Sequence, residues 1–131
     1  MSNNPTSQSG STELSQILSQ MNEAGNFPIS ILTDRNGFPI ASATASGEDP
    51  ELQSAVVALV QKTAAQVQQQ LGMAPTDEIS MFDTAGRRLV CRPFEINEHK
   101  LILAVVVPDR KQSYRRLTNT TVKAIKRRWR L

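Results

Sequence analysis

The residue types that most often carry chemistry are scarce in this sequence, which has one histidine, His99, and one cysteine, Cys91. A histidine that acts as a general base needs a nucleophile and an orienting acid within reach. The sequence shows no Ser or Cys nucleophile with such an acid at a recognisable spacing. We expect His99 to lie in an exposed turn and Cys91 to be a small buried residue of a strand. One histidine and one cysteine cannot supply the four ligands of a structural zinc ion. The sequence therefore predicts no catalytic residues, no metal site and no enzyme activity.

Phosphate-binding motifs are also missing from the sequence. No Gly-x-x-x-x-Gly-Lys run occurs, and the glycines stand alone at expected turns or helix ends. We therefore expect no bound nucleotide or other cofactor. The acidic residues gather at expected turns and helix starts, where carboxylates accept backbone hydrogen bonds. These residues are Asp34, Glu48, Asp49, Glu51, Asp77 and Asp83.

Basic residues are concentrated near the end of the sequence. Residues 1–108 hold 6 Lys or Arg and 11 Asp or Glu, whereas residues 109–131 hold 9 Lys or Arg and one acid. A helix is expected there from about Gln112 or Ser113, because apolar residues recur with helical spacing. Its apolar side comprises Tyr114, Leu117, Thr121, Val122, Ile125 and Trp129. Its basic side comprises Arg115, Arg116, Lys123, Lys126, Arg127 and Arg130.

The basic side of this helix allows three interpretations. It is a solvated polar face, a docking surface for an acidic protein or an anionic membrane, or a site for a nucleic-acid backbone, which is the least favoured. The first interpretation is weakened because residues 113–131 contain no acidic i,i+4 partner. The sequence leaves all three open.

The clearest helix is expected over residues 49–71. Asp49 can cap it, Pro50 suits its first position and Gly72 follows its end. At about 100° per residue, its apolar side chains cover an arc of roughly 200°. A helix that lies on one sheet needs an apolar stripe of only about 100°. The additional apolar arc calls for a second partner.

Five strands and a further helix complete the expected fold. Strands are expected at residues 29–33, 38–43, 78–82, 88–94 and 101–107, and a first helix starts at Ser11 or Thr12 and ends at Gly25. Tight turns imply antiparallel pairing, and the uniformly apolar last strand, LILAVVV, should lie in the middle of the sheet. Helices should cover both faces of one five-stranded sheet, which makes this an α/β (α+β) fold.

The sequence divides into three parts in this interpretation. Residues 1–10 are a polar, disordered leader, residues 11–122 form the domain, and residues 123–131 extend its basic last helix. The leader lacks the apolar core of a secretory signal, and a lone cysteine suits a reducing compartment. We therefore expect a cytoplasmic protein.

The segment from Ile29 to Ser42, ISILTDRNGFPIAS, resembles the Roadblock/dynein light chain domain family. That family typically shows a strand, then Asp-x-x-Gly, an apolar residue, Pro or a small residue, an apolar residue and Ala-Ser. The Ala/Val-rich second helix and the last three strands fit the same pattern, so the resemblance extends over residues 11–122.

The resemblance implies a sheet order of 2-1-5-4-3, with the second helix on one face and the N- and C-terminal helices on the other. It also implies a homodimer, or a heterodimer with a paralogous chain, in which second helices pack side by side and third strands pair across the two-fold axis. The interface expected on this basis comprises Leu52, Val56, Leu59, Val60, Thr63, Val67, Ile79 and Met81. Family members are scaffolds for motor cargo, or recruit, bind or activate small Ras-like GTPases, and have no catalytic set of their own.

A dimeric scaffold or small-GTPase regulator is therefore the favoured function. An electrostatic adaptor that uses the basic helix is the alternative. A sensor domain that holds a small ligand between sheet and helix is less favoured, because no polar residues converge to select a ligand.

Overall fold

The computed structural model describes residues 11–44 and 50–129, and the side chains of residues 12–44 and 53–129. The elements are α1 (Ser11–Gly25), β1 (Ile29–Asp34), β2 (Pro39–Thr44), α2 (Pro50–Leu71), β3 (Ile79–Phe82), β4 (Arg88–Ile96), β5 (His99–Val107) and α3 (Arg115–Arg128). This is the predicted order of helix, two strands, helix, three strands and helix. The expected leader and the expected helix cap Asp49 lie outside the described residues.

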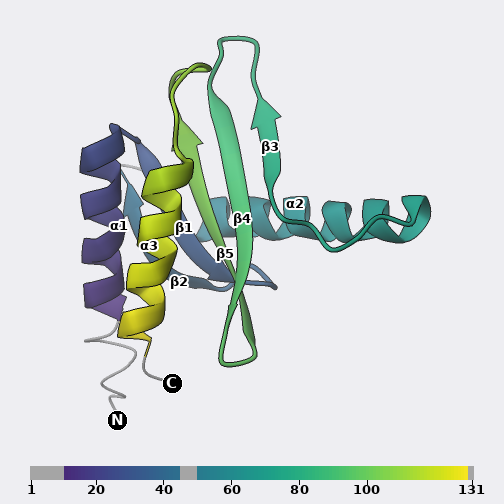
Figure 1. Ribbon diagram of the computed structural model, residues 1–131, viewed down its shortest axis with the longest axis horizontal. Helices are drawn as coiled ribbons and strands as arrows, with labels where there is room; N and C mark the ends of the chain where they lie inside the picture. Colours follow the sequence, from purple (N-terminus) through teal and green to yellow (C-terminus); the bar gives the residue numbers. More distant parts are fainter. Residues whose placement is uncertain (1–10, 45–49, 130–131) are drawn as a thin grey trace.

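The five strands form one antiparallel sheet in the order β2-β1-β5-β4-β3, as predicted. The apolar strand β5 lies at its centre, where Leu101 to Val105 are all buried. Figure 1 shows α1 and α3 side by side on one face of the sheet and α2 on the other. The predicted fold class and the distribution of helices are confirmed.

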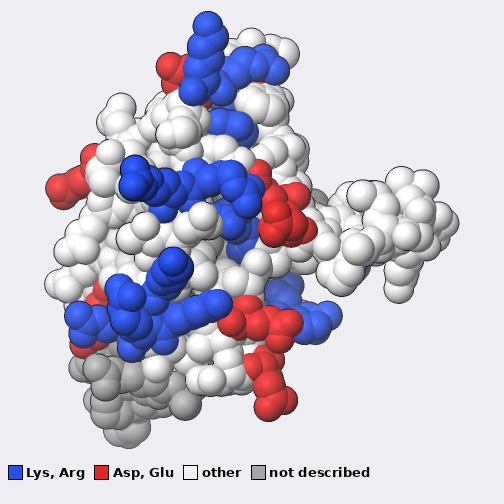
Figure 2. Space-filling model, in the orientation of Figure 1, with Lys and Arg blue, Asp and Glu red and all other residues white. Residues whose placement is uncertain are grey.

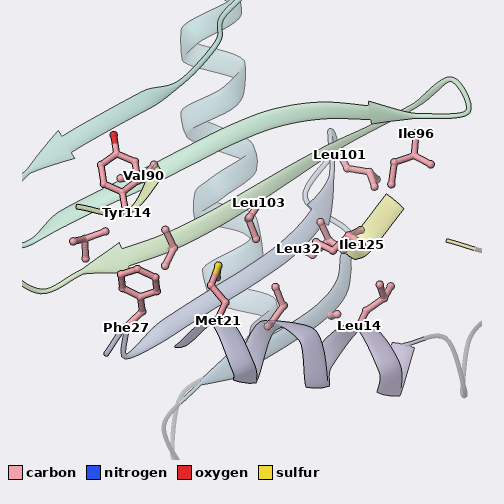
Figure 3. Close-up of a cluster of buried hydrophobic side chains, with 14 residues drawn as sticks. Leu14, Met21, Phe27, Leu32, Val90, Ile96, Leu101, Leu103, Tyr114 and Ile125 are labelled. Atoms are coloured by element: carbon pink, nitrogen blue, oxygen red, sulfur yellow. The ribbon is translucent and has the colours of Figure 1, made fainter. Parts of the chain in front are cut away.

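The two faces of the sheet are packed to very different extents. Between the sheet and the helices α1 and α3 lies a large apolar core, part of which is seen in Figure 3. Beneath α2 the core formed by the described residues is small: Val57, Cys91, Ile102 and Ala104 are buried there, and Val60, Ile79 and Leu89 pack against them. Because burial of an aliphatic side chain contributes about 2 kcal/mol, α2 is attached to the sheet less firmly than α1 or α3.

The β1–β2 turn fixes the position of α2. The Asp34 carboxylate accepts hydrogen bonds from the backbone N–H groups of Asn36 (2.8 Å) and Phe38 (2.9 Å). Gly37 has a φ of 89°, and a Cβ atom at this position would lie 2.6 Å from the Cβ of Ala58 in α2. Only glycine therefore allows the turn to lie this close to the helix.

The strands β4 and β5 are longer than predicted. Their turn contains only Asn97 and Glu98, with φ values of 47° and 72°, as two-residue hairpin turns of the primed type require. His99 was expected in this turn, but it begins β5 and pairs with Ile96 of β4. The sequence contains no glycine at the turn, which is why its short form could not be foreseen. His99 is exposed, as predicted.

The helix α3 begins later than predicted and has no break at residue 123. A turn formed by Asp109, which accepts hydrogen bonds from Lys111 and Gln112, delays its start until Arg115. The helix then continues to Arg128, and Ile125 is completely buried in the main core. The expected boundary between domain and extension at residues 122 and 123 has no counterpart in this helix. Removal of residues 123–131 would take a core residue away.

Candidate protein-interaction surface

The helix α2 exposes most of its apolar side chains. Of its described side chains only Ser54 and Val57 are buried. Leu59 is 64% exposed and Leu71 is 70% exposed, and Val56 and Val67 lie exposed on the same half of the helix. The surplus apolar arc predicted from the sequence is thus an outward-facing apolar surface.

The second half of α2 extends beyond the sheet. Figure 1 shows it projecting past β3, with the linker to β3 returning beside it. Residues 63–76 contain no charged residue, and Figure 2 shows the projecting part of the molecule as uncharged surface. An uncharged projection with exposed apolar side chains is typical of a surface that contacts another protein.

The strand β3 is an edge strand next to this projection. Among the described strands it pairs only with β4, so its other side presents backbone groups that none of those strands covers. Met81 is 53% exposed, and Met73 in the preceding linker and Phe82 at the end of the strand are also exposed. Together with α2, these residues form what we call the α2–β3 surface: Val56, Leu59, Val67, Leu71, Met73, Met81 and Phe82.

The residues expected at a dimer interface fall into two groups. Val56, Leu59, Thr63, Val67 and Met81 are exposed, as an interface requires. Val60 and Ile79 are half-buried and pack against the small core around Cys91, so they support their own domain. The side chain of Leu52 lies outside the described residues.

Sequence analysis missed three members of the α2–β3 surface. Leu71, Met73 and Phe82 are exposed on this surface, but the interface expected from the sequence does not include them. The long uncharged run from residue 63 to residue 76 was the available signal. Such a run is unusual for exposed chain unless a partner covers it.

The cations of α3 differ in how far they are neutralised. Arg115, expected to contact an anionic partner, instead forms ion pairs with Glu78 (2.7 Å) and Asp77 (3.8 Å). Arg128 pairs with Glu13 of α1 (3.9 Å). The exposed cations Arg116, Lys123, Lys126 and Arg127 have no ion-pair partner among the described residues. Arg130 lies outside them. Figure 2 shows the resulting basic area over α3.

Glu78, just before β3, connects this strand to α3. Its carboxylate accepts hydrogen bonds from the hydroxyl groups of Tyr114 and Ser80, the latter at 3.0 Å, in addition to the ion pair with Arg115. Arg92 of β4 lies 3.9 Å from the same carboxylate. Arg92 also donates hydrogen bonds to Thr118 (2.7 Å) and Asn119 (2.5 Å) of α3. We call Glu78, Arg92, Tyr114 and Arg115 the Glu78 network.

The groups that could take part in catalysis lie apart from one another. Cys91 is buried beneath α2, where it pairs with Ala104, and burial raises the pKa of its thiol to about 12. His99 lies at the far end of β5, with its ring centroid 6.0 Å from that of Trp129. Since the thiolate is the nucleophilic form, the raised pKa makes Cys91 a poor nucleophile in the folded protein. Within the described residues, no three His, Cys, Asp or Glu side chains are placed to hold a metal ion.

An apolar pocket of about 250 Å³ lies between α2 and the sheet. Its lining includes Ile31, Val56 and Leu89, and Gln53 is its one polar side chain. This is smaller than the 300–1,000 Å³ of typical ligand pockets, and the lining offers little polar selectivity. None of the described helices has the length and apolar character that crossing a membrane requires.

Comparison with known proteins identifies structural relatives. No family model and no curated protein matches the sequence. Among solved structures, MglB from Myxococcus xanthus has a TM-score of 0.67 at 17% identity, over 89% of this chain and 91% of that one. The gliding protein MglB from Thermus thermophilus has a TM-score of 0.71 at 18% identity, over 98% and 93% of the two chains. A Roadblock/LC7 domain from Streptomyces avermitilis has a TM-score of 0.69 at 10% identity, over 86% and 92%.

Proposed function

Because this chain has the Roadblock/LC7 fold, we propose that it is a non-enzymatic scaffold that self-associates through the α2–β3 surface and recruits a small Ras-like GTPase or a larger protein complex. One observation supports this most strongly. Every large hydrophobic side chain that is exposed in the described part of the chain, except Phe38, belongs to α2, the linker after it or β3. Apolar side chains gathered on one surface in this way mark protein-binding sites.

The geometry of an edge strand determines how two copies would meet. Two β3 strands that pair antiparallel in one continuous sheet are related by a two-fold axis normal to that sheet. Both copies of α2 then lie on the same face, and each projecting end extends over the neighbouring sheet. Pairing would satisfy the free backbone groups of β3 and remove apolar area from water at about 25 cal/mol per Å².

The GTPase part of the proposal has a different basis. It rests on the resemblance of residues 29–42 to the Roadblock/dynein light chain family, whose members recruit or activate Ras-like GTPases. For self-association there is a parallel, since MglB, a protein of similar fold, is described with a tetrameric arrangement. A dimer would offer a GTPase a sheet and two adjacent helices as a broad platform.

The substitution Leu59→Glu tests the interface. A carboxylate at this exposed position would be buried without a partner on association, so we expect monomers or aggregates where the unchanged protein is a dimer. Light scattering coupled to size-exclusion chromatography gives the mass directly. The immobilised dimer should also retain a Ras-like GTPase from the same organism.

Phe38→Glu is the matched control, because Phe38 is exposed to a similar degree but lies in the β1–β2 turn. It should leave the mass of the dimer unchanged. A folded dimer of the Leu59→Glu variant, or dissociation by both substitutions alike, would contradict the proposed interface.

The basic area on α3 supports a second candidate function, attachment to an anionic membrane or acidic protein. Arg116, Lys123 and Arg127 lie on one exposed face of the helix, seven and four residues apart, without acidic partners among the described residues. The apolar side of α3 is buried in the core, so attachment would be electrostatic and would not involve insertion.

Replacement of these three residues by glutamine tests the second candidate while leaving Ile125 in place. Sedimentation with vesicles that contain phosphatidylglycerol should show binding by the unchanged protein, about fivefold weaker for each cation removed. Binding that is indifferent to salt, or unaffected by the three substitutions, would exclude this mode.

A further inference from the structure

A groove lies beside α2 and reaches residues of the opposite face of the sheet, among them Phe94 and Lys126. It has a volume of about 1210 Å³ and is lined by α2, the β1–β2 turn, the linker before β3 and the β4–β5 hairpin, with Lys126 of α3 at its margin. Its apolar lining includes Leu59, Phe94 and Ile102. The volume exceeds the 300–1,000 Å³ of typical small-molecule pockets, so a segment of polypeptide fits it better.

Most of the α2 residues that line the groove lie on the opposite flank of the helix from the apolar stripe of the α2–β3 surface. At 100° per residue, Ala58, Lys62 and Ala65, which line the groove, centre about 160° away from the stripe of Val56 and Val67. Leu59 belongs to both surfaces, so association of two chains through the apolar stripe would cover the groove at Leu59 and leave open the part lined by Ala58, Lys62 and Ala65.

The groove carries a positive charge that the described residues do not neutralise. Arg35, Lys62, Lys100 and Lys126 line it, all exposed, and Glu95 is the one acid among its lining residues. Glu95 stands directly opposite Lys100 in the β4–β5 ladder. Arg35, Lys62 and Lys126 have no ion-pair partner in the described part of the chain.

We propose that this groove binds an acidic peptide segment of a partner protein, one that also carries apolar side chains. The cations come from four separate elements: the β1–β2 turn, α2, β5 and α3. The apolar lining provides contacts that a purely anionic ligand would not use. Because the groove is a recess with α2 along one side, it suits a protruding segment better than a flat bilayer. The inference rests on the proposed scaffold function and names the chemistry of the partner.

Fluorescence anisotropy with the full chain tests the proposal. The probe is a fluorescein-labelled synthetic peptide in which Glu alternates with Leu and Phe, and its twin has Gln in place of each Glu. We expect saturable, salt-sensitive binding of the acidic peptide only. The double variant Arg35→Glu, Lys62→Glu should bind it about tenfold more weakly or worse, since two favourable charge contacts become repulsive.

Two further pairs of variants separate the groove from general attraction to positive charge. Arg116→Glu with Lys123→Glu makes the same change of charge on α3 and should leave binding unchanged. Ala65→Trp fills the groove without changing its charge and should reduce binding. Gln66→Trp adds the same bulk at the next position, which does not line the groove, and should have no effect.

The results that would overturn the inference are distinct. The inference would be overturned if the Arg35, Lys62 double variant bound the acidic peptide as tightly as the unchanged protein, or if the α3 control lost as much binding as that variant. It would also be overturned if Ala65→Trp had no effect, or if the acidic peptide did not bind at all. Competition by anionic vesicles or duplex DNA as effective as unlabelled peptide would also overturn it. A monomeric protein that still binds the peptide would support the inference and contradict the proposed dimer. A dimer that does not bind the peptide would contradict this inference but not the proposed dimer.

Discussion

Cys91 shows how the position of a single residue determines its chemistry. It lies beneath α2 in the smaller core, and burial raises the pKa of its thiol from 9.0 to about 12. The cause is desolvation, which disfavours the charged thiolate. The folded protein therefore keeps the Cys91 thiol protonated up to a higher pH than the unfolded protein does.

This shift predicts a pH-dependent contribution of Cys91 to stability. Because its folded pKa is raised, the contribution is complete below pH 9.0 and is lost as the pH rises towards 12. The free energy of unfolding should fall by about 1.4 kcal/mol per pH unit in this range through this thiol alone. Urea unfolding of the unchanged protein and of Cys91→Ala, at neutral and alkaline pH, isolates the effect. Parallel pH profiles of the two proteins would contradict it.

Individual residues differed in how well the sequence predicted their roles. Asp34 and Asp83 act in turns as expected, because an aspartate accepts hydrogen bonds from backbone groups two to four residues ahead wherever the chain turns. Arg115 was assigned to an anionic partner, but its ion pairs are with Asp77 and Glu78, far away in sequence. Local chemistry can be inferred from neighbours in sequence, whereas long-range ion pairs depend on the fold.

At the scale of elements, the Glu78 network joins an exposed edge strand to a helix on the face opposite α2. The side chains of Glu78 and Arg92 are only 15% and 14% exposed, so the solvent screens their interaction weakly. Tyr114 and Arg115 add contacts from the start of α3. A half-buried carboxylate with this many partners stabilises the start of β3 more than an exposed ion pair could.

Glu78→Gln should therefore lower the free energy of unfolding by about 2 kcal/mol, because Arg92 is left half-buried without a carboxylate. Chemical denaturation measures this directly. Asp77→Asn is the control, since the Asp77 side chain is 84% exposed and lies 3.8 Å from Arg115. Its effect should stay below about 0.5 kcal/mol. Equal effects of the two substitutions would show that the network does not stabilise β3.

For the whole molecule, the sequence predicted the architecture well. The uniformly apolar β5 pointed to the centre of the sheet, and the turn residues after β1 and β3 pointed to antiparallel pairing. These are strong signals because burial and turn conformation each depend on short stretches of sequence. The two-residue turn at Asn97 and the late start of α3 were missed, since neither has a distinctive local sequence.

The candidate surfaces were only partly predictable. The width of the apolar arc on α2 indicated an interface, and Val56, Leu59 and Val67 are exposed there. Helical periodicity could not show that α2 extends beyond the sheet, which exposes Leu71 and the linker after it. The groove could not be predicted, because Arg35, Lys62 and Lys126 are far apart in sequence and line one groove only in the folded chain.

The Glu78 network has a consequence for how distant parts of this protein communicate. The Glu78 carboxylate contacts both Ser80 of the edge strand β3 and Arg115 in the first turn of α3. A subunit that binds to this edge and a ligand that binds to this helix would therefore each affect the position of the same carboxylate. Thermodynamic linkage makes such an influence mutual. Whatever factor an acidic partner on α3 applies to the affinity between subunits, subunit pairing must apply to the affinity for that partner.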